Sequence, residues 1–275
     1  MSQTLAAALS AAQASGLDKL DAEVLLAHVL EKGRTYLIAW PEKQLTSEQN
    51  DRYSQLVQRR ARGVPVAYIT GMREFWSLPI KTSPATLIPR PDTEVLVETV
   101  LEKQNERPLS CLDLGAGTGA IALALKSERP SWSIMGIDCI DEAIELASAN
   151  ARNLSLNVQF TKGNWCAGVP GSSLDIIVSN PPYIDSEDPH LEQGDVRFEP
   201  SSALVAPQSG FADIELIATQ ATRCLKPGGW LFLEHGWQQA ERVRSILSDS
   251  GFAEVDSRCD YGGNERVTFG CLKNQ

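Results

Sequence analysis

The sequence predicts an α/β protein with a doubly wound, largely parallel sheet, a small N-terminal helical domain and a β-hairpin linker. Three observations predict this class. Residues 1–73 carry apolar residues at helical spacing, and residues 74–90 alternate aromatic and β-branched residues around prolines. From about residue 109, short apolar runs alternate with amphipathic segments of helical period, which is typical of parallel strands joined by helices.

The N-terminal region is expected to be helical from its apolar spacing. Leu5, Leu9 and Ala12 recur at helical intervals. A later helix begins with a predicted capping box, because Thr46 and Gln49 stand three residues apart. It ends at "RRARG", whose arginines either complement the helix dipole or form a docking patch for an acidic or RNA-bound partner.

Residues 74–90 form the predicted hairpin linker, and residues 91–275 form the predicted second domain. Asp92 is expected to cap a helix with the sequence "TEVLVETVLEK". The last two strands are expected to be joined through Gly262 and Gly263. A sheet of this kind binds its ligands at the carboxyl ends of its strands. The other expected strands are "LSCLDLG", "SIMGID", "VQFTKGN", "LDIIVSN" and "GGWLFLEH".

The charge of the chain disfavours a nucleic-acid substrate. Residues 1–75 hold nine Lys and Arg against eight Asp and Glu, whereas the other 200 residues hold 16 against 27. A domain this acidic repels a phosphate backbone unless a basic groove overrides the repulsion, and the sequence shows no such groove.

Cysteine spacing and hydropathy indicate which sites the protein lacks and where it is located. The six cysteines include no C-x-x-C pair and no neighbouring histidine cluster, so we expect no metal site, no disulfide framework and a cytoplasmic location. No apolar run approaches the roughly 18 residues of a membrane span, and the N-terminus lacks the positive start of a signal peptide. We therefore expect no membrane association.

A glycine-rich loop and an acidic residue follow the first two strands of the second domain. The loop lets the backbone approach a bound molecule and turn sharply into a helix. Asp138 ends the next strand, where its carboxylate can accept both hydroxyl hydrogens of a ribose. Together they indicate a nucleoside cofactor. The loop comprises Gly115, Ala116, Gly117, Thr118 and Gly119.

Two further strand ends carry candidate site residues. Asn164 and Trp165 offer a polar edge and an aromatic wall for an adenine. Asn180 begins an Asn-Pro-Pro-Tyr segment, in which the amide oxygen of Asn180 and the carbonyl of Pro181 can accept N–H groups from one target. The prolines stiffen the backbone, and Tyr183 can pack against a planar group. Two acceptors and a flat wall fit an NH₂ group on a planar system, either an amide or an aromatic amine.

These segments resemble the protein-(glutamine) methyltransferases that modify peptide chain release factors, which use S-adenosylmethionine. The resemblance covers nearly the whole chain. The Asn-Pro-Pro-Tyr segment alone is shared with adenine methyltransferases of DNA, whereas "LIPRPDTE" is much more specific. The chain departs from the family pattern at Ala116, where Thr is frequent, and at Asn164, where an acidic residue commonly precedes the Trp. The supporting segments are "REFWSLPIKTSPATLIPRPDTE", "NPPYIDSEDPHLEQGDVRFEP" and "LEHGWQQ".

The resemblance implies a Rossmann-like methyltransferase domain that methylates the glutamine of a Gly-Gly-Gln loop during translation termination. It implies that Asn180 and Pro181 are catalytic and bind the substrate amide together with Pro182 and Tyr183. The N-terminal domain and hairpin would grip the release factor, and the enzyme is expected to act as a monomer. The implied cofactor-binding residues are Gly115, Ala116, Gly117, Thr118, Gly119, Asp138, Trp165 and Asn180.

Three alternatives stay open at this point. They are a glutamine methyltransferase of a ribosomal protein, an adenine amino-methyltransferase of nucleic acid, and a cofactor-binding module without activity. Arg90, Asp92, Glu94 and Glu199 lie in motif segments expected near the pocket, where caps, salt bridges and loop anchoring would also explain them.

Overall fold

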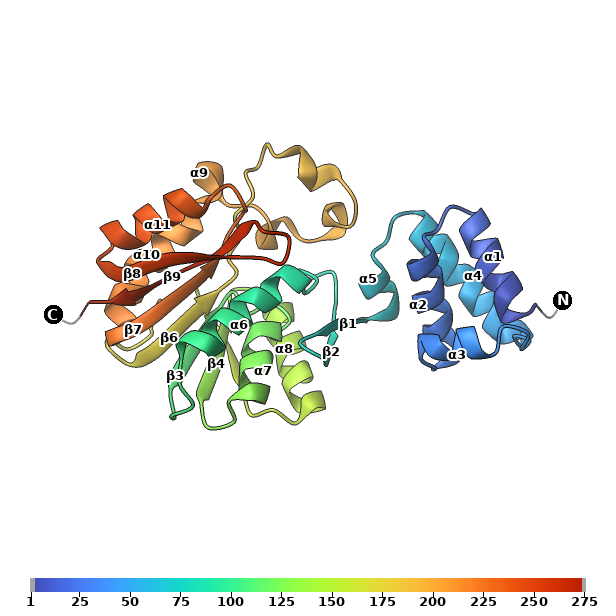
Figure 1. The fold of residues 1–275 in the computed structure, drawn as a ribbon, viewed down its shortest axis with the longest axis horizontal. Helices are drawn as coiled ribbons and strands as arrows, with labels where there is room; N and C mark the ends of the chain where they lie inside the picture. Colours follow the sequence, from blue (N-terminus) through green and yellow to red (C-terminus); the bar gives the residue numbers. More distant parts are fainter. Residues whose placement is uncertain (1–2, 274–275) are drawn as a thin grey trace. The chain divides into compact units, whose positions relative to one another are not determined.

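The computed structural model describes residues 3–273, which fold into two compact units (Figure 1). The first comprises Met1–Met72 with Glu192–Phe198, and the second comprises Arg73–Leu191 and Glu199–Gln275. Helices build the first unit, and a seven-stranded sheet with helices builds the second, so the predicted fold class is confirmed. Within residues 3–273, no helix has the length and apolar character needed to cross a bilayer.

The first unit packs around apolar residues that recur at helical spacing. Leu5, Leu25 and Leu26 are almost fully buried. Tyr53 is also buried, and its hydroxyl donates to the carbonyl of Ala22 at 3.1 Å. A core of this kind forms when each helix turns its apolar face inward. The helices are α1 (Leu5–Ala14), α2 (Lys19–Leu30), α3 (Arg34–Ala39), α4 (Ser47–Ala61) and α5 (Val66–Thr70).

Helix α4 begins with the predicted capping box. The N–H of Gln49 donates to Thr46 Oγ1 at 3.1 Å, and the N–H of Thr46 donates to Gln49 Oε1 at 3.0 Å. Near the end of the helix, Arg60 pairs with Asp21 at 2.6 Å and with Asp195 at 2.8 Å. The second pair anchors the segment Glu192–Phe198 to this unit, so Arg60 of the "RRARG" cluster has a structural role.

A two-stranded hairpin follows, formed by β1 (Met72–Phe75) and β2 (Leu78–Lys81). Its two turn residues, Trp76 and Ser77, have φ values of 52° and 58°, as a type I′ turn requires. The N–H of Trp76 donates to Glu94 Oε1 at 2.8 Å, which attaches the turn to the helix that begins at Glu94. The hairpin begins at Met72, two residues before the predicted range 74–90, and no strand lies in that range after Lys81.

The second unit contains the doubly wound sheet that the sequence predicts. Its strand order is β5-β4-β3-β6-β7-β9-β8, and the first five strands pair in parallel. Strand β9 pairs antiparallel with both of its neighbours. The chain order reverses between β3 and β6, which is where such sheets bind ligands. The strands are β3 (Ser110–Leu114), β4 (Ser133–Asp138), β5 (Gln159–Lys162), β6 (Leu174–Ser179), β7 (Leu225–Glu234), β8 (Phe252–Cys259) and β9 (Glu265–Leu272).

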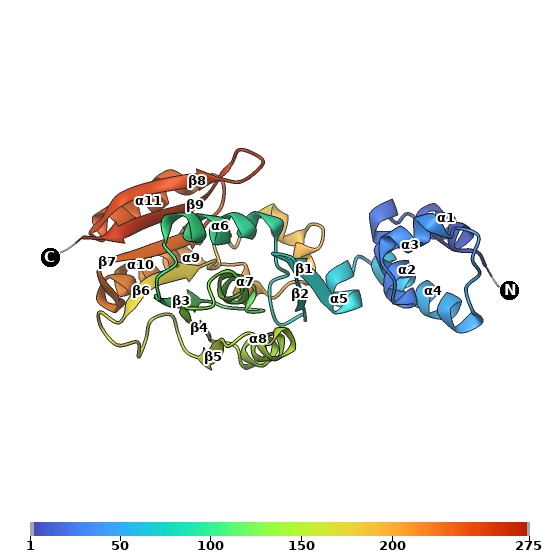
Figure 2. The same ribbon diagram turned by 60° about the horizontal axis from the view of Figure 1, so that its bottom comes forward.

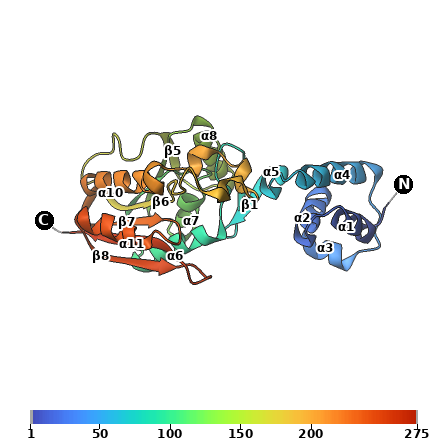
Figure 3. The same cartoon turned by 90° about the horizontal axis from the view of Figure 1, so that it is seen from above.

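Apolar side chains on both faces of the sheet pack against the helices that cover it. On β6, Ile176 and Val178 contribute to one core cluster and Ile177 to the other, as alternation along a strand requires. Figure 2 shows α8 beside β5, and Figure 3 shows α10 beside β7. The first cluster includes residues of α6 (Glu94–Lys103), α7 (Ala120–Glu128) and α8 (Asp141–Leu154), and the second includes residues of α10 (Ala212–Cys224) and α11 (Ala240–Asp249).

The start of α6 differs from the expectation. Asp92 does not cap it but lies inside a 3₁₀ turn, η1 (Pro91–Thr93), which precedes the helix. Pro91 occupies the first position of the turn, where its fixed φ favours a helical start. The carboxylate of Asp92 instead pairs with Arg266 at 3.8 Å. The turn therefore carries the residues of "LIPRPDTE" toward the carboxyl ends of the strands.

Candidate functional site

A cavity of about 320 Å³ lies at the carboxyl ends of β3, β4 and β6, within the second unit. Its position at the reversal of strand order agrees with the general rule for doubly wound sheets. Gly119, Pro181 and Tyr183 are not among its lining residues. Of the predicted site residues, those lining it are Gly115, Ala116, Gly117, Thr118, Asp138, Asn164, Trp165, Asn180 and Pro182.

The glycine-rich loop is held by hydrogen bonds to the neighbouring strand. The N–H groups of Gly115 and Ala116 donate to the carbonyl of Ile137 at 2.9 and 3.0 Å. Gly119 has a φ of 80°, and a Cβ there would lie 2.7 Å from the ring of Phe160. Glycine is therefore required at this position by both backbone conformation and packing.

Asp138 fixes the loop and faces the cavity. Its Oδ2 accepts the N–H of Gly117 at 2.8 Å, and its Oδ1 accepts the N–H of Ile140 at 3.0 Å. A carboxylate offers about four lone-pair positions, so each oxygen can accept a further donor from a ligand. The two backbone bonds fix its orientation before any ligand binds.

Trp165 forms a wall of the cavity beside the loop. Its ring lies 3.3 Å from the point where a Cβ on Gly115 would be. Trp165 has a φ of 47°, which is uncommon for an aromatic residue. Asp213 lies close to Trp165, and burial raises the pKa of the Asp213 carboxyl. Asp213 also lines the cavity and gives it a second carboxyl group.

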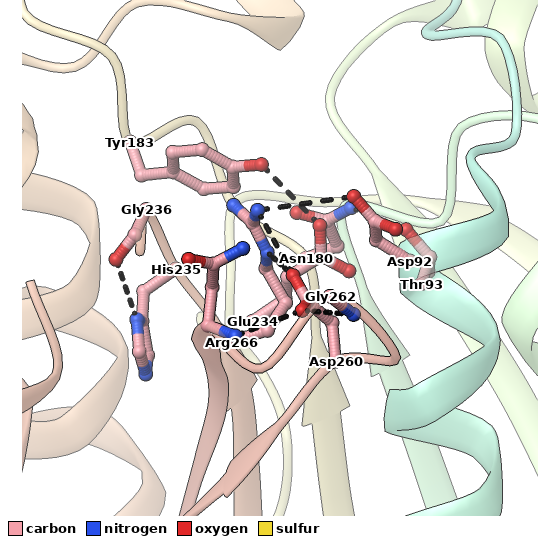
Figure 4. A network of polar contacts seen from close by, with 11 residues as sticks. Asp92, Thr93, Asn180, Tyr183, Glu234, His235, Gly236, Asp260, Gly262 and Arg266 are labelled. Carbon is pink, nitrogen blue, oxygen red and sulfur yellow. Dashed lines mark hydrogen bonds and ion pairs between the residues drawn. The ribbon is translucent and has the colours of Figure 1, made fainter. Parts of the chain in front are cut away.

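Asn180 follows directly after β6. Its Nδ2 donates to Thr93 Oγ1 at 3.3 Å (Figure 4). Its Oδ1 accepts no hydrogen bond from any of the described residues. An amide oxygen at the edge of the cavity is therefore free to accept an N–H from a ligand.

Tyr183 takes a different position from the wall that the sequence suggests. Its ring packs against the apolar cluster around β6 and β7, and its hydroxyl donates to Glu234 Oε1 at 3.3 Å. Burial raises the pKa of this hydroxyl. Its backbone carbonyl accepts from Gln239 Nε2 at 3.0 Å, and a Cβ on Gly210 would lie 2.1 Å from the same oxygen. These contacts fix the end of the Asn-Pro-Pro-Tyr segment.

Glu199 anchors the chain before η1. Its side chain is fully buried, and its two oxygens accept the N–H of Ile88 at 3.1 Å and Arg90 Nη2 at 2.5 Å. Arg90 itself lines the cavity. These contacts support a loop-anchoring role for Arg90 and Glu199.

Asp113 is a buried acid beneath the glycine-rich loop. Its Oδ2 accepts the N–H of Ala122 at 3.2 Å, and its Oδ1 has no partner among residues 3–273. Burial, with a smaller contribution from Asp138, raises the pKa of this carboxyl to about 7. Asp113 lies in the predicted strand before the loop, but the sequence alone does not indicate that its pKa is raised.

Comparison with known proteins identifies the family. Residues 2–71 match the family described as PrmC N-terminal domain, and residues 91–198 match Methyltransferase small domain. Proteins named release factor glutamine methyltransferase from Escherichia coli (strain K12) and Vibrio cholerae serotype O1 are each 53% identical to the chain. The first alignment covers 96% of this chain and 95% of the relative, and the second covers 100% and 99%. The chain belongs to the release factor glutamine methyltransferase family.

Solved structures similar to this family member support the fold alone. A methyltransferase from Pyrococcus furiosus aligns with a TM-score of 0.57 at 17% identity, covering 82% of this chain and 99% of that one. A ribosomal protein L11 methylase from Lactobacillus delbrueckii subsp. bulgaricus aligns with a TM-score of 0.50 at 19% identity, covering 66% and 80%.

Several lining residues of the cavity were not identified as site residues from the sequence, and three of them come from different elements. Phe75 comes from the hairpin, Thr93 from η1 and Asp213 from the start of α10. A signal existed for Thr93, because it lies in "LIPRPDTE", the segment most specific to the family. Asp213 had no such signal, since its contact with Trp165 joins residues far apart in the sequence.

The raised pKa of Asp113 predicts a specific loss of stability at higher pH. The unfolded carboxyl ionises near its ordinary value of 3.8, whereas the folded one keeps its proton until about pH 7. The contribution of this group to stability is therefore complete below about pH 4 and is lost as the pH rises toward 7. Asp113→Asn cannot ionise and should lose less stability than the wild type between pH 4 and 8, by up to roughly 4 kcal/mol.

Urea unfolding at pH 4 and pH 8 measures this difference. Asp51→Asn, at an exposed carboxylate on α4, is the matched control and should follow the wild type. An Asp113→Asn protein with the same pH dependence as the wild type would contradict the assignment.

Proposed function

We propose that this protein transfers a methyl group from S-adenosylmethionine to the side-chain amide nitrogen of a glutamine. The proposed substrate is the Gly-Gly-Gln loop of peptide chain release factors. The names of the relatives support this substrate, because the alignments cover almost the whole of each chain. One observation in the site supports methyl transfer to an amide nitrogen. Asn180 Oδ1 accepts no hydrogen bond from the described residues, and it lies beside a cavity whose residues suit a nucleoside.

The cavity residues suit the proposed cofactor. The fixed carboxylate of Asp138 can accept the ribose hydroxyls, and Trp165 can stack on the adenine. Asn164 can accept the adenine amino group. The loop Gly115–Gly119 would approach the remainder of the molecule through its backbone. Bound there, the cofactor supplies a methyl group on a positively charged sulfur, a charge that the cavity carboxylates of Asp138 and Asp213 favour.

Asn180 and Pro181 provide the proposed catalytic contacts. A glutamine amide nitrogen is a poor nucleophile because its lone pair is delocalised into the carbonyl. Asn180 Oδ1 and the Pro181 carbonyl would accept the two amide protons and so direct the nitrogen toward the methyl group. As the nitrogen gains positive charge, these hydrogen bonds strengthen, which stabilises the transition state. The extra proton leaves after the transfer, so no strong general base is assigned.

The remaining parts of the chain have proposed roles in recognition. A single glutamine offers little surface for selection, so residues 1–73 and the hairpin linker would bind the release factor outside the active site. Residues 91–275 would form the methyltransferase domain. The acidic character of the second domain supports a protein substrate over nucleic acid.

Transfer of labelled methyl groups from the cofactor tests the substrate. The panel contains a release factor, its Gln→Ala loop variant, a ribosomal protein and DNA. We expect label only in the intact release factor, located on the loop glutamine by mass spectrometry. Equal labelling of the Gln→Ala variant, or stronger labelling of the ribosomal protein or of DNA, would refute the proposed substrate.

Two alanine variants should separate catalysis from cofactor binding. Asn180→Ala should lower kcat by roughly a hundredfold or more while leaving cofactor affinity largely intact, because the lost contact strengthens in the transition state. Asp138→Ala should chiefly weaken cofactor binding, because it removes the proposed ribose acceptor. Turnover and calorimetric cofactor titration measure both effects. Unchanged turnover in the first variant, or unchanged affinity in the second, would remove that residue from its proposed role.

A further inference from the structure

The Asn-Pro-Pro-Tyr segment is held at its two ends. Its prolines have no N–H to donate, so the middle of the segment cannot be held by N–H donors of its own. At its start the segment follows Ser179, the last residue of β6, which the sheet holds. At its end the carbonyl of Tyr183 accepts from Gln239 Nε2 at 3.0 Å. The far end is thus held by a side chain that the proposed chemistry does not use.

Gln239, which directly precedes α11, bonds to backbone groups with both ends of its amide. Its Oε1 accepts the N–H of Gly236 at 2.8 Å, and its Nε2 donates to the carbonyls of Tyr183 at 3.0 Å and Ser209 at 3.4 Å. A backbone N–H can only donate and a carbonyl can only accept, so these partners determine the orientation of the amide. The three hydrogen bonds, the Gln239 clamp, join the loop after β7 to the Asn-Pro-Pro-Tyr segment and to α9 (Pro207–Gly210).

The α9 turn approaches the Tyr183 carbonyl closely. Residues 208–210 have φ values of 56°, 54° and 85°, a left-handed conformation that residues other than glycine rarely adopt. A Cβ on Gly210 would lie 2.1 Å from the Tyr183 oxygen and 2.8 Å from Gln239 Nε2. The Tyr183 carbonyl is therefore held between Gly210 and Gln239.

The loop from which Gln239 extends is itself fixed. The N–H of His235 donates to the carbonyl of Arg266 at 3.0 Å, and His235 Nδ1 lies 2.9 Å from the carbonyl of Gly236 (Figure 4). Burial lowers the pKa of this imidazole to about 4, so the ring is neutral near pH 7. Since a carbonyl has no proton to give, Nδ1 carries the proton and Nε2 accepts from the Thr268 hydroxyl at 2.7 Å. Gln239 therefore extends from a loop whose backbone is held by the sheet.

We propose that Gln239 is a positioning residue for methyl transfer, because the Gln239 clamp holds the end of the Asn-Pro-Pro-Tyr segment where Asn180 Oδ1 and the Pro181 carbonyl face the substrate amide. The proposal rests on the proposed function of Asn180. The prolines transmit the constraint from Tyr183 to Asn180, because their rings fix φ in the residues between them. Asp138 holds the glycine-rich loop through other backbone groups, so we expect cofactor binding not to depend on Gln239.

Gln239→Glu tests the donor half of the clamp. The variant keeps the size of the side chain and an oxygen that can accept from Gly236, but its carboxylate places a second acceptor against the Tyr183 carbonyl. At pH 8, kcat should fall roughly tenfold or more, with KM for the release factor and cofactor Kd within about twofold. Gln238→Glu, at the exposed neighbouring residue, is the matched control and should behave as the wild type.

The pH dependence of kcat follows the hydrogen bond itself. When the introduced carboxyl is protonated, its O–H can donate to the Tyr183 carbonyl in place of the lost N–H. The facing carbonyl and the partial burial of the site favour this neutral form, so the ratio of the Gln239→Glu to the wild-type kcat should rise as the pH falls from 8 to 5.5. Gln239→Ala has no such group, and its ratio should stay low at both pH values.

Four results would each overturn the proposal. They are an unchanged kcat in Gln239→Glu at pH 8, an equal loss in Gln238→Glu, a Gln239→Glu ratio that stays constant with pH, and a loss of kcat that matches a loss of folded protein. Urea unfolding of each variant at both pH values measures the folded fraction.

Asn180→Ala, measured beside these variants, separates this proposal from the proposed function. An inactive Asn180→Ala beside a fully active Gln239→Glu refutes the positioning role of Gln239 alone. A fully active Asn180→Ala refutes the catalytic role of Asn180 and the positioning role with it.

Discussion

The parallel ladder between β3 and β6 is the constraint on which the site depends. It pairs Leu114 with Ser179, so the glycine-rich loop and Asn180 leave the sheet side by side. The hydroxyl of Ser179 donates to the carbonyl of Leu114 at 2.7 Å and strengthens this junction. Because the chain order reverses at these two strands, the loops diverge above them and leave room for the cavity.

Three carboxylates hold loops of the site in place. Asp138 holds the glycine-rich loop, Glu199 holds the chain before η1, and Glu234 accepts the hydroxyl of Tyr183 at the end of the Asn-Pro-Pro-Tyr segment. Each is the acceptor for a donor from a different element, so a loop that is distant in the sequence becomes fixed relative to the sheet. Such anchoring keeps contacts in place before a ligand binds, which lowers the cost of reaching the transition state.

Much of the fold could be predicted from the sequence because it depends on local patterns. The apolar runs of β3 and β6, the glycine-rich loop and the capping box at Thr46 each have a physical signature within a few residues. The hydrogen bond from Asn180 to Thr93, and the proximity of Asp213 to Trp165, could not be predicted in this way. Both join residues separated by many positions and depend on strand order and helix placement. Asp92 was misassigned for a related reason, since its distant partner Arg266 has no local signal.

The direct test of the account is the orientation of the Asn180 side-chain amide in the folded enzyme. NMR with ¹⁵N-labelled asparagine, assigned by its absence in Asn180→Ala, can measure nuclear Overhauser effects from the Nδ2 protons. The hydrogen bond from Asn180 Nδ2 to Thr93 Oγ1 predicts contacts between these protons and the Thr93 side chain, and their loss in Thr93→Val. Nδ2 protons without contacts to the Thr93 side chain would show a reversed amide and contradict this orientation.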